Sequence, residues 1–118
     1  MAVGALDHIY YWTADMEAAV AFYGDVVGLK LLRREGAAWA EFDAGPVRFA
    51  LHAGHEDAVT PGGTAVLEVD DLDAARRRLG ERGVVFDHDD GEVPGLARFA
   101  SFRDPDGNVL QIIEYLRS

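Results

Sequence analysis

Two segments of the chain carry apolar residues at the spacing of an amphipathic helix, and each follows a short apolar run that predicts a strand. The first segment predicts a helix over residues 15–28, because Asp15 is a suitable N-cap and Gly28 a suitable end. Its apolar positions are Met16, Ala19, Val20, Tyr23 and Val27. This spacing places one face of the helix against a core.

The second segment predicts a helix over residues 71–83, capped by Asp71 or Asp70 and ended by Gly83. Its apolar positions are Leu72, Ala75 and Leu79, and its expected solvent side carries Arg76, Arg77 and Arg78. The residues that start this helix align with those that start the first at an offset of 71 − 15 = 56 residues. We therefore interpret the two helices as parts of an internal repeat.

The repeat predicts two modules, each with the element order β-α-β-β-β. Module one is expected at about residues 5–53 and module two at about residues 64–116. The segment 54–63 between them is rich in polar residues, Pro and Gly, and predicts a linker. The expected fold class is α+β, with both modules in a single domain over residues 1–118.

Alternation along the predicted strands separates a polar and aromatic face from an apolar one. On the first strand His8, Tyr10 and Trp12 share a side, opposite Ile9 and Tyr11. The same parity places further side chains on the corresponding side of other strands: Arg48, His52, Thr64, Glu68 and Gln111. Aromatic rings beside polar groups favour a ligand cavity over the alternative, an ordinary solvated sheet face.

Composition narrows the classes of partner. The chain has 118 residues, and 11 Lys and Arg against 21 Asp and Glu give a formal net charge of −10. An acidic chain argues against binding nucleic acid, which needs a basic face. The acidity indicates solubility or, alternatively, a cavity suited to cations. Since the chain has no cysteine, disulfides, thiolate metal sites and thiol nucleophiles are excluded.

Targeting and membrane signals are also missing from the printed sequence. No apolar run approaches the roughly 20 residues that a membrane span requires, so no membrane partner is expected. The first residues lack the basic flank and apolar stretch of a signal peptide. We therefore expect a cytoplasmic protein.

Three motifs, taken in order, resemble the vicinal oxygen chelate superfamily, which includes glyoxalase I, bleomycin resistance proteins and extradiol dioxygenases. The motifs are LDHIYYWTADMEAAVAFYGDVVGLKLL, AVLEVDDLDAARRRLGERGVVF and FASFRDPDGNVLQIIEY. The resemblance covers nearly the whole chain. It implies two βαβββ modules that each contribute a curved four-stranded sheet to a cup around the active site, and a homodimer at this chain length.

The resemblance also implies where a metal would be held, since metal-dependent members use side chains from the first and last strand of each module. Those positions fall on His8, Ala50 (or Phe49 if the register shifts by one), Thr64 and Gln111. His8 and Gln111 are the tentative metal ligands, with His52 and Glu68 as nearby additions. The hydroxyl of Thr64 is a poor ligand for a transition metal. We therefore do not expect a standard four-ligand centre; a divalent metal stays open as a cofactor, and no nucleotide cofactor is expected.

Three functional hypotheses follow. The first is a protein of the bleomycin-resistance kind that binds a small planar or cationic molecule without changing it. Its expected ligand-binding residues are Tyr10, Trp12, Arg48, His52, Glu68 and Gln111, with Trp39 as a further stacking candidate. The alternative is a lyase, isomerase or dioxygenase with an unusual site around His8 and Gln111, in which His8 and Glu68 are the catalytic candidates. The third is a scaffold that keeps the fold without chemistry.

The segment 88–99 is a candidate lid because it contains Gly and Pro in an acidic context. The alternative is an ordinary hairpin connection. Arg98 and Arg103 either contact a carboxylate substrate or offset the surrounding acidic residues.

Overall fold

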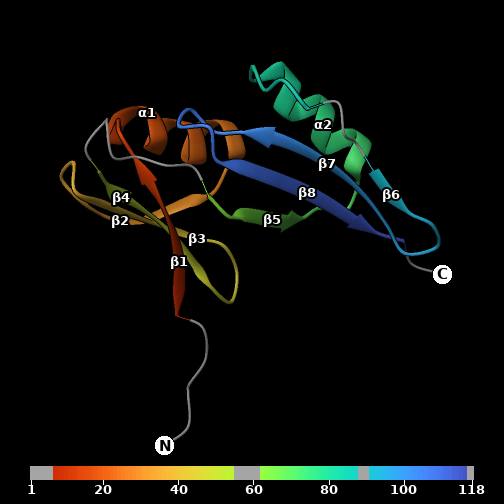
Figure 1. Ribbon diagram of the computed structural model, residues 1–118, viewed down its shortest axis with the longest axis horizontal. Coiled ribbons are helices and arrows are strands. Elements are labelled where there is room, and N and C mark those ends of the chain that lie inside the picture. Colours follow the sequence, from red (N-terminus) through yellow and green to blue (C-terminus); the bar gives the residue numbers. More distant parts are fainter. Residues whose placement is uncertain (1–6, 55–61, 88–90, 117–118) are drawn as a thin grey trace, which may run out of the picture. The chain divides into compact units, whose positions relative to one another are not determined.

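The computed structural model describes residues 7–54, 62–87 and 91–116 (Figure 1). The chain divides into two compact units, residues 1–60 and 61–118. Each unit contains one four-stranded sheet and helical structure in the predicted β-α-β-β-β order. The expected α+β fold with two βαβββ repeats is thereby confirmed.

The first unit has its sheet in the order β1-β4-β3-β2 (Figure 1). Its elements are β1 (His8–Thr13), α1 (Met16–Ala21), η1 (Phe22–Val27), β2 (Lys30–Glu35), β3 (Trp39–Asp43) and β4 (Arg48–Ala53). Strand β1 is parallel to β4, and the other neighbours are antiparallel. The first and last strands of the unit therefore lie side by side.

The second unit repeats this topology, with the sheet order β5-β8-β7-β6. Its elements are β5 (Thr64–Glu68), α2 (Leu72–Glu81), β6 (Gly91–Val93), β7 (Ala97–Arg103) and β8 (Val109–Tyr115). Strand β5 is parallel to β8, as β1 is to β4. Residues 91–99, part of the candidate lid, belong to the β6–β7 hairpin, which matches the alternative interpretation; residues 88–90 lie outside the described residues.

The first predicted helix begins and ends where expected but changes type midway. The Asp15 side chain accepts a hydrogen bond from Ala18 N at 3.1 Å, and Gly28 has the left-handed φ of 94° that ends the segment. From Phe22 onward the segment is a π-helix rather than the continuous α-helix that we predicted. A π turn takes about one residue more than an α turn, so it shifts the phase of the side chains that follow it. Tyr23, near its start, is fully buried, as the helical spacing predicted.

The second predicted helix is capped twice. The Asp71 side chain accepts from Ala74 N at 3.0 Å, and Glu114 Oε1 on β8 accepts from Leu72 N at 2.6 Å. Both carboxylates lie at the N-terminus of the helix, where the positive end of the helix dipole stabilises a negative charge. Leu72 is buried, as the apolar pattern predicted, and Gly83 ends the segment with a φ of 96°.

The two apolar sheet faces form the cores of their units, as the strand alternation predicted. In the first unit the largest buried side chains are Tyr11, Tyr23, Phe42, Phe49 and Leu51. In the second unit they are Phe102, Leu110, Ile112, Leu72 and Leu79. Apolar burial of this kind supplies most of the free energy that stabilises a domain. We call the opposite side of each sheet its open face.

The DPDGN motif forms the turn between β7 and β8. Gly107 N donates to Asp104 O at 3.0 Å, which closes the predicted four-residue turn. The buried Asp104 carboxylate accepts from Asp106 N, Asn108 N and Asn108 Nδ2 at 2.8 to 3.0 Å. This motif is therefore structural.

Among the described residues, no helix has the length and apolar character needed to cross a membrane.

Candidate functional site

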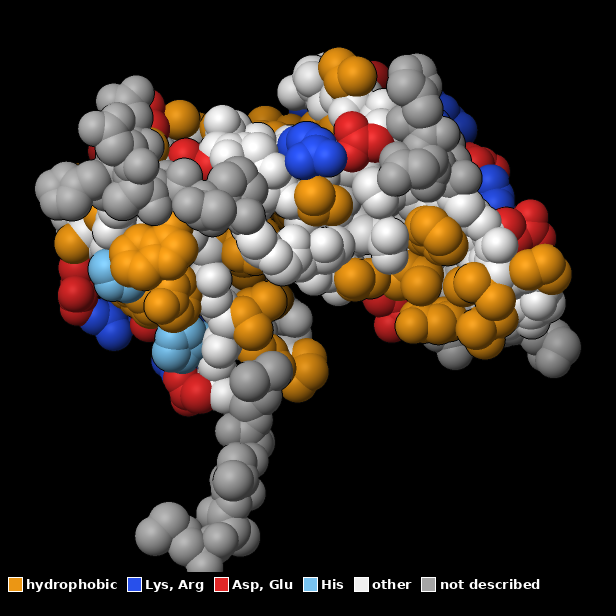
Figure 2. Space-filling model, viewed as in Figure 1, with side chains coloured by type: hydrophobic (Ala, Val, Ile, Leu, Met, Phe, Trp, Pro, Cys, Tyr) orange, Lys and Arg blue, Asp and Glu red, His pale blue; other side chains and the backbone are white. Residues whose placement is uncertain are grey.

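The open face of the first sheet gathers aromatic and charged side chains from all four strands. Register pairs His8 with Arg48, Trp12 with His52, and Trp39 with His52. The side chains on this face are His8, Tyr10 and Trp12 from β1, Arg48, Ala50 and His52 from β4, Trp39, Glu41 and Asp43 from β3, and Lys30, Arg33 and Glu35 from β2. In Figure 2 the two pale-blue histidines lie beside orange side chains. The strand alternation predicted this face for β1 and β4.

Five rings on this face contact one another: His8, Tyr10, Trp12, Trp39 and His52. The centroid of Trp12 lies 4.3 Å from that of His52, and Trp39 meets both histidines edge-on at 5.6 Å. Tyr10 lies 5.6 to 6.3 Å from each of the other four centroids. These distances are those of favourable aromatic pairs. We call this group the ring cluster.

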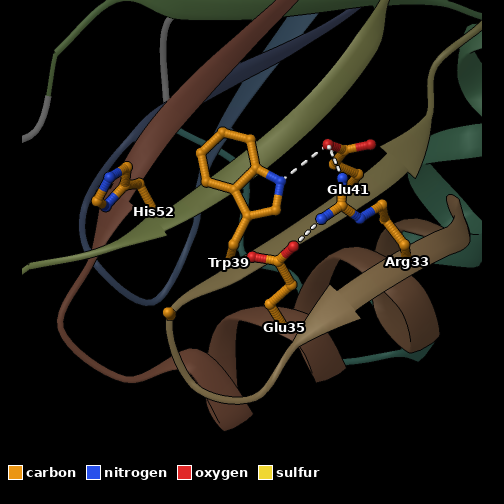
Figure 3. Close-up of a pocket in the computed structure, with 6 residues that line it drawn as sticks. Arg33, Glu35, Trp39, Glu41 and His52 are labelled. Atoms are coloured by element: carbon orange, nitrogen blue, oxygen red, sulfur yellow. Dashed lines mark hydrogen bonds and ion pairs between the residues drawn. The ribbon is translucent and has the colours of Figure 1, made fainter.

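A hollow of about 420 Å³ lies at the edge of the ring cluster (Figure 3). It is lined by Arg33, Glu35, Ala38, Trp39, Glu41 and His52. This volume is in the range of small-molecule sites. Figure 3 shows the Trp39 indole between His52 on one side and the charged residues on the other. The hollow therefore offers an aromatic surface and charged groups to the same ligand.

Glu41 connects the ring cluster to the charged groups. Its side chain is 10% exposed, and Oε1 accepts from Trp39 Nε1 at 2.9 Å. Arg33 Nη1 lies 3.6 Å from Oε1, and Arg48 Nη1 lies 3.4 Å from Oε2. A buried carboxylate requires such partners. Glu41 thus holds an indole and two guanidinium groups that come from three different strands.

Asp7 binds the other arm of Arg48 and also His8. Its Oδ2 lies 2.6 Å from Arg48 Nη2 and 2.7 Å from His8 Nδ1. The hydrogen bond to His8, followed by the charge of Arg48, lowers the pKa of the Asp7 carboxyl. Because Asp7 is then ionised at neutral pH, Nδ1 of His8 is the donor and Nε2 is left as the basic ring atom.

A β-bulge places Arg33 on the open face. Leu31 pairs with Phe42, but Glu41 pairs with Arg33 rather than with the next residue, Leu32. Without this extra residue, strict alternation would put Arg34 on the open face; instead Arg34 forms an ion pair with Glu17 of α1. Sequence analysis did not treat this strand and so missed Arg33; strict alternation would not have found it either, because an alternating pattern carries no signal of a bulge.

Two further residues of the hollow were also missed. Glu35 and Glu41 belong to strands that the strand alternation did not treat, although both share the open face with Trp39. The alternation of WAEF over residues 39–42 was the available signal, because Ala40 and Phe42 are fully buried while Trp39 and Glu41 face the other way.

The other predicted site residues lie on the second unit. Thr64 and Glu68 are exposed on β5, and Gln111 Nε2 on β8 donates to Ser101 Oγ at 3.4 Å. Glu68 lines a hollow of about 230 Å³ whose other lining residues are Val69, Asp70, Glu114 and Tyr115. The open face of this sheet is more apolar than that of the first, since Val66 is 50% and Val93 45% exposed.

The side chains at the metal-ligand positions do not fit a divalent transition metal. Ala50 occupies the last-strand position of the first unit and is fully buried, while Phe49 points into the core. Thr64 offers a neutral hydroxyl, which leaves an imidazole from His8 and a carboxamide from Gln111. Holding a catalytic ion usually takes three strong ligands. Among the described residues, no group of three His, Asp or Glu side chains is placed to hold a metal.

Arg98 and Arg103 both pair with acidic side chains. Arg98 Nη2 donates to Asp73 on α2 at 3.0 Å, which lowers the pKa of Asp73. Arg103 Nε lies 3.6 Å from Asp87. These contacts match the expectation that the two arginines offset neighbouring acids. His55 in the predicted linker and His88 in the candidate lid lie outside the described residues, as does most of that linker.

Comparisons with known proteins agree with this architecture. The chain is similar over its whole length to a glyoxalase/bleomycin resistance protein/dioxygenase from Nocardioides, with 25% identity, 87% of that chain covered and a TM-score of 0.79. It is 30% identical to TnmS3, an antibiotic binding protein from Streptomyces sp. CB03234, with 98% of this chain and 99% of that chain covered and a TM-score of 0.82.

A lactoylglutathione lyase from Agrobacterium tumefaciens shares the fold, with 24% identity, 96% and 95% of the two chains covered and a TM-score of 0.80. A search of curated protein sequences found no match. The family model described as Glyoxalase/Bleomycin resistance protein/Dioxygenase superfamily matches residues 5–112. The chain therefore belongs to the glyoxalase/bleomycin resistance protein/dioxygenase superfamily.

Proposed function

We propose that the protein binds a planar small molecule by stacking on the ring cluster, without a standard metal centre. The observation that carries this proposal is the gathering of five aromatic and imidazole rings beside a hollow of about 420 Å³. Rings that are already packed together lose little freedom when a ligand stacks on them. The donor set at the metal-ligand positions supports the metal-free form of the proposal.

Two features support a preformed binding surface. The Trp39 indole is held by Glu41, so its face does not have to be ordered when a ligand arrives. The ring cluster also remains partly exposed, with Tyr10 at 44% and Trp12 at 40%. The similarity to an antibiotic binding protein from Streptomyces is consistent with a binding role.

The proposal is tested by titrating the protein with phenazine, a neutral three-ring compound. Both tryptophans of the chain, Trp12 and Trp39, belong to the ring cluster, so quenching of intrinsic fluorescence reports on this face. We expect saturable quenching, weakened about tenfold in Trp39→Leu, since aromatic pairs contribute about 0.5–1.5 kcal/mol beyond burial. Phe22→Leu on the helix side is the matched control and should bind like the wild type. Binding that Trp39→Leu leaves unchanged would contradict the proposal.

A second candidate function is acid–base catalysis at His8, and the Asp7–His8 pair is the observation that favours it. A carboxylate on Nδ1 orients an imidazole and leaves Nε2 to take a proton from a bound molecule. The test is mass spectrometry of ligands recovered after incubation. Conversion that stops in His8→Ala would favour catalysis, whereas unchanged ligand from the wild type would leave binding alone.

A further inference from the structure

In each of the two arginines of the open face, the two terminal nitrogens, which we call its arms, have different kinds of partner. Arg33 and Arg48 each direct Nη1 at the buried Glu41 carboxylate. Their Nη2 atoms contact exposed carboxylates, those of Glu35 (60% exposed) and Asp7 (70% exposed). An ion pair with an exposed carboxylate contributes little and exchanges readily, whereas a buried carboxylate has a fixed position. Each guanidinium therefore keeps one arm beside a buried charge, at 3.6 Å for Arg33 and 3.4 Å for Arg48. Its other arm pairs with an exposed carboxylate and is the exchangeable one.

Arg33 is the arginine whose exchangeable arm belongs to the hollow. Arg33 and Glu35 both line it beside Trp39, and Figure 3 shows the contacts running from Glu35 through Arg33 to Glu41. The bulge in β2 brings Arg33 to this face, and bulges recur where a side chain is re-aimed next to a functional site. The Arg33 side chain is 53% exposed and lines the hollow beside an indole, so its guanidinium suits a ligand with both a planar ring and an anionic group.

We propose that the hollow selects planar aromatic molecules that bear an anionic oxygen group, and that this group replaces the Glu35 carboxylate on Arg33. The inference rests on the proposed function, since it adds a charge preference to the stacking site. In this exchange the anionic group of the ligand pairs with Arg33 in place of Glu35. An acidic protein can therefore bind an anion without a further positive group in the hollow. It also reverses the expectation of a cationic ligand, because Glu41, the buried acid of the hollow, already faces two arginines.

The test compares three ligands with the same three-ring frame and different charge at pH 7.5: anthracene-9-carboxylate, phenazine and 9-aminoacridine. Calorimetric titration of the full chain should show the carboxylate binding about tenfold more tightly than phenazine, and 9-aminoacridine no more tightly than phenazine. The preference for the carboxylate should fall as salt is raised from 50 to 500 mM, because an exposed ion pair is screened.

Variants separate the exchange from a merely structural role. Arg33→Gln should abolish the preference for the carboxylate while phenazine still binds. Glu35→Gln should tighten carboxylate binding several-fold, because it removes the competing group; a residue that only supports the fold would not do this. Arg34→Gln is the matched control, since the neighbouring arginine pairs with Glu17 and not with the hollow. Thermal unfolding of each variant checks that it is folded.

The outcomes distinguish this inference from the proposed function. Equal affinity for the three compounds would overturn the charge preference while leaving the stacking site in place. Weaker binding of the carboxylate in Glu35→Gln would overturn the exchange. Failure of all three compounds to bind would reject the proposed function itself.

Discussion

Asp104→Ala is the substitution with the largest expected effect on stability in the DPDGN turn. Asp104 is 6% exposed, and its carboxylate accepts three N–H groups, two of them from Asn108, which is 2% exposed. Alanine would leave the backbone N–H and the side-chain amide of Asn108 buried without their acceptor. The third donor, Asp106 N, belongs to a half-exposed residue and can be hydrated.

Each buried N–H group that is left without an acceptor lowers the free energy of unfolding by about 1–3 kcal/mol. Two such donors give an expected loss of about 2–6 kcal/mol, a large part of the roughly 5–15 kcal/mol that stabilises a typical domain. Asp104→Asn keeps one carbonyl oxygen for the backbone donors but turns an amide toward Asn108. We expect its loss to be smaller, about 1–2 kcal/mol.

The assay is urea unfolding followed by far-ultraviolet circular dichroism, which yields the free energy of unfolding of each variant. The double variant Asp104→Ala with Asn108→Ala supplies the control, because removing Asn108's side-chain amide removes one stranded donor. We expect the double variant to lose less than the sum of the two single variants. Strict additivity, or a loss below about 1 kcal/mol in Asp104→Ala, would refute the argument that these donors need the carboxylate.

Three further predictions concern the metal positions, the charged pair at the edge of the first sheet and the β6 strand. Calorimetric titration of metal-stripped protein with Ni²⁺, Co²⁺, Fe²⁺, Mn²⁺ and Zn²⁺ should show no tight site; one tight site per chain that His8→Ala abolishes would contradict the donor argument. In an NMR titration the Asp7 carboxyl should have a pKa below its usual 3.8, rising toward that value in Arg48→Gln. Because the folded pKa is lowered, the stability that Asp7 adds should be present above pH 3.8 and lost as the pH falls through the folded pKa; an unchanged pKa in the variant would exclude the ion pair. Gly91→Ala should cost about 1–3 kcal/mol of unfolding free energy in urea, because a Cβ there would lie 2.1 Å from Phe99 Cζ, and Phe99→Leu should relieve most of that cost.

The fold could be predicted from the sequence because its main signals are local. Each helical segment begins at an Asp N-cap and ends at a left-handed glycine, and both signals act within a few residues: Asp15 and Gly28 in the first segment, Asp71 and Gly83 in the second. Because the unit is repeated, the same signals occur twice in the sequence. The change from α- to π-helix at Phe22 was not predictable in this way. Tyr23 in this segment packs against Phe42 and Phe49, whose positions depend on tertiary packing.

The candidate site was predictable only in part, for a related reason. Strand alternation placed His8, Tyr10 and Trp12 on one face because parity is a local property. The contribution of Arg33 depends on one extra residue in β2, and such a bulge is set by pairing with β3. The role of Glu41 likewise depends on donors from three strands, which no single segment reveals.

The parallel pairing of the first and last strand in each unit has a consequence for synthesis on the ribosome. In the first unit His8 pairs with Arg48, 40 residues later, so β1 stays without its neighbour until nearly the whole unit has been made. Closing such a long segment costs entropy before any hydrogen bond of the pair is gained. A nascent chain that stops before Arg48 therefore exposes β1 with its rings unpaired. We expect stalled chains of this length to be targets for chaperones and proteases.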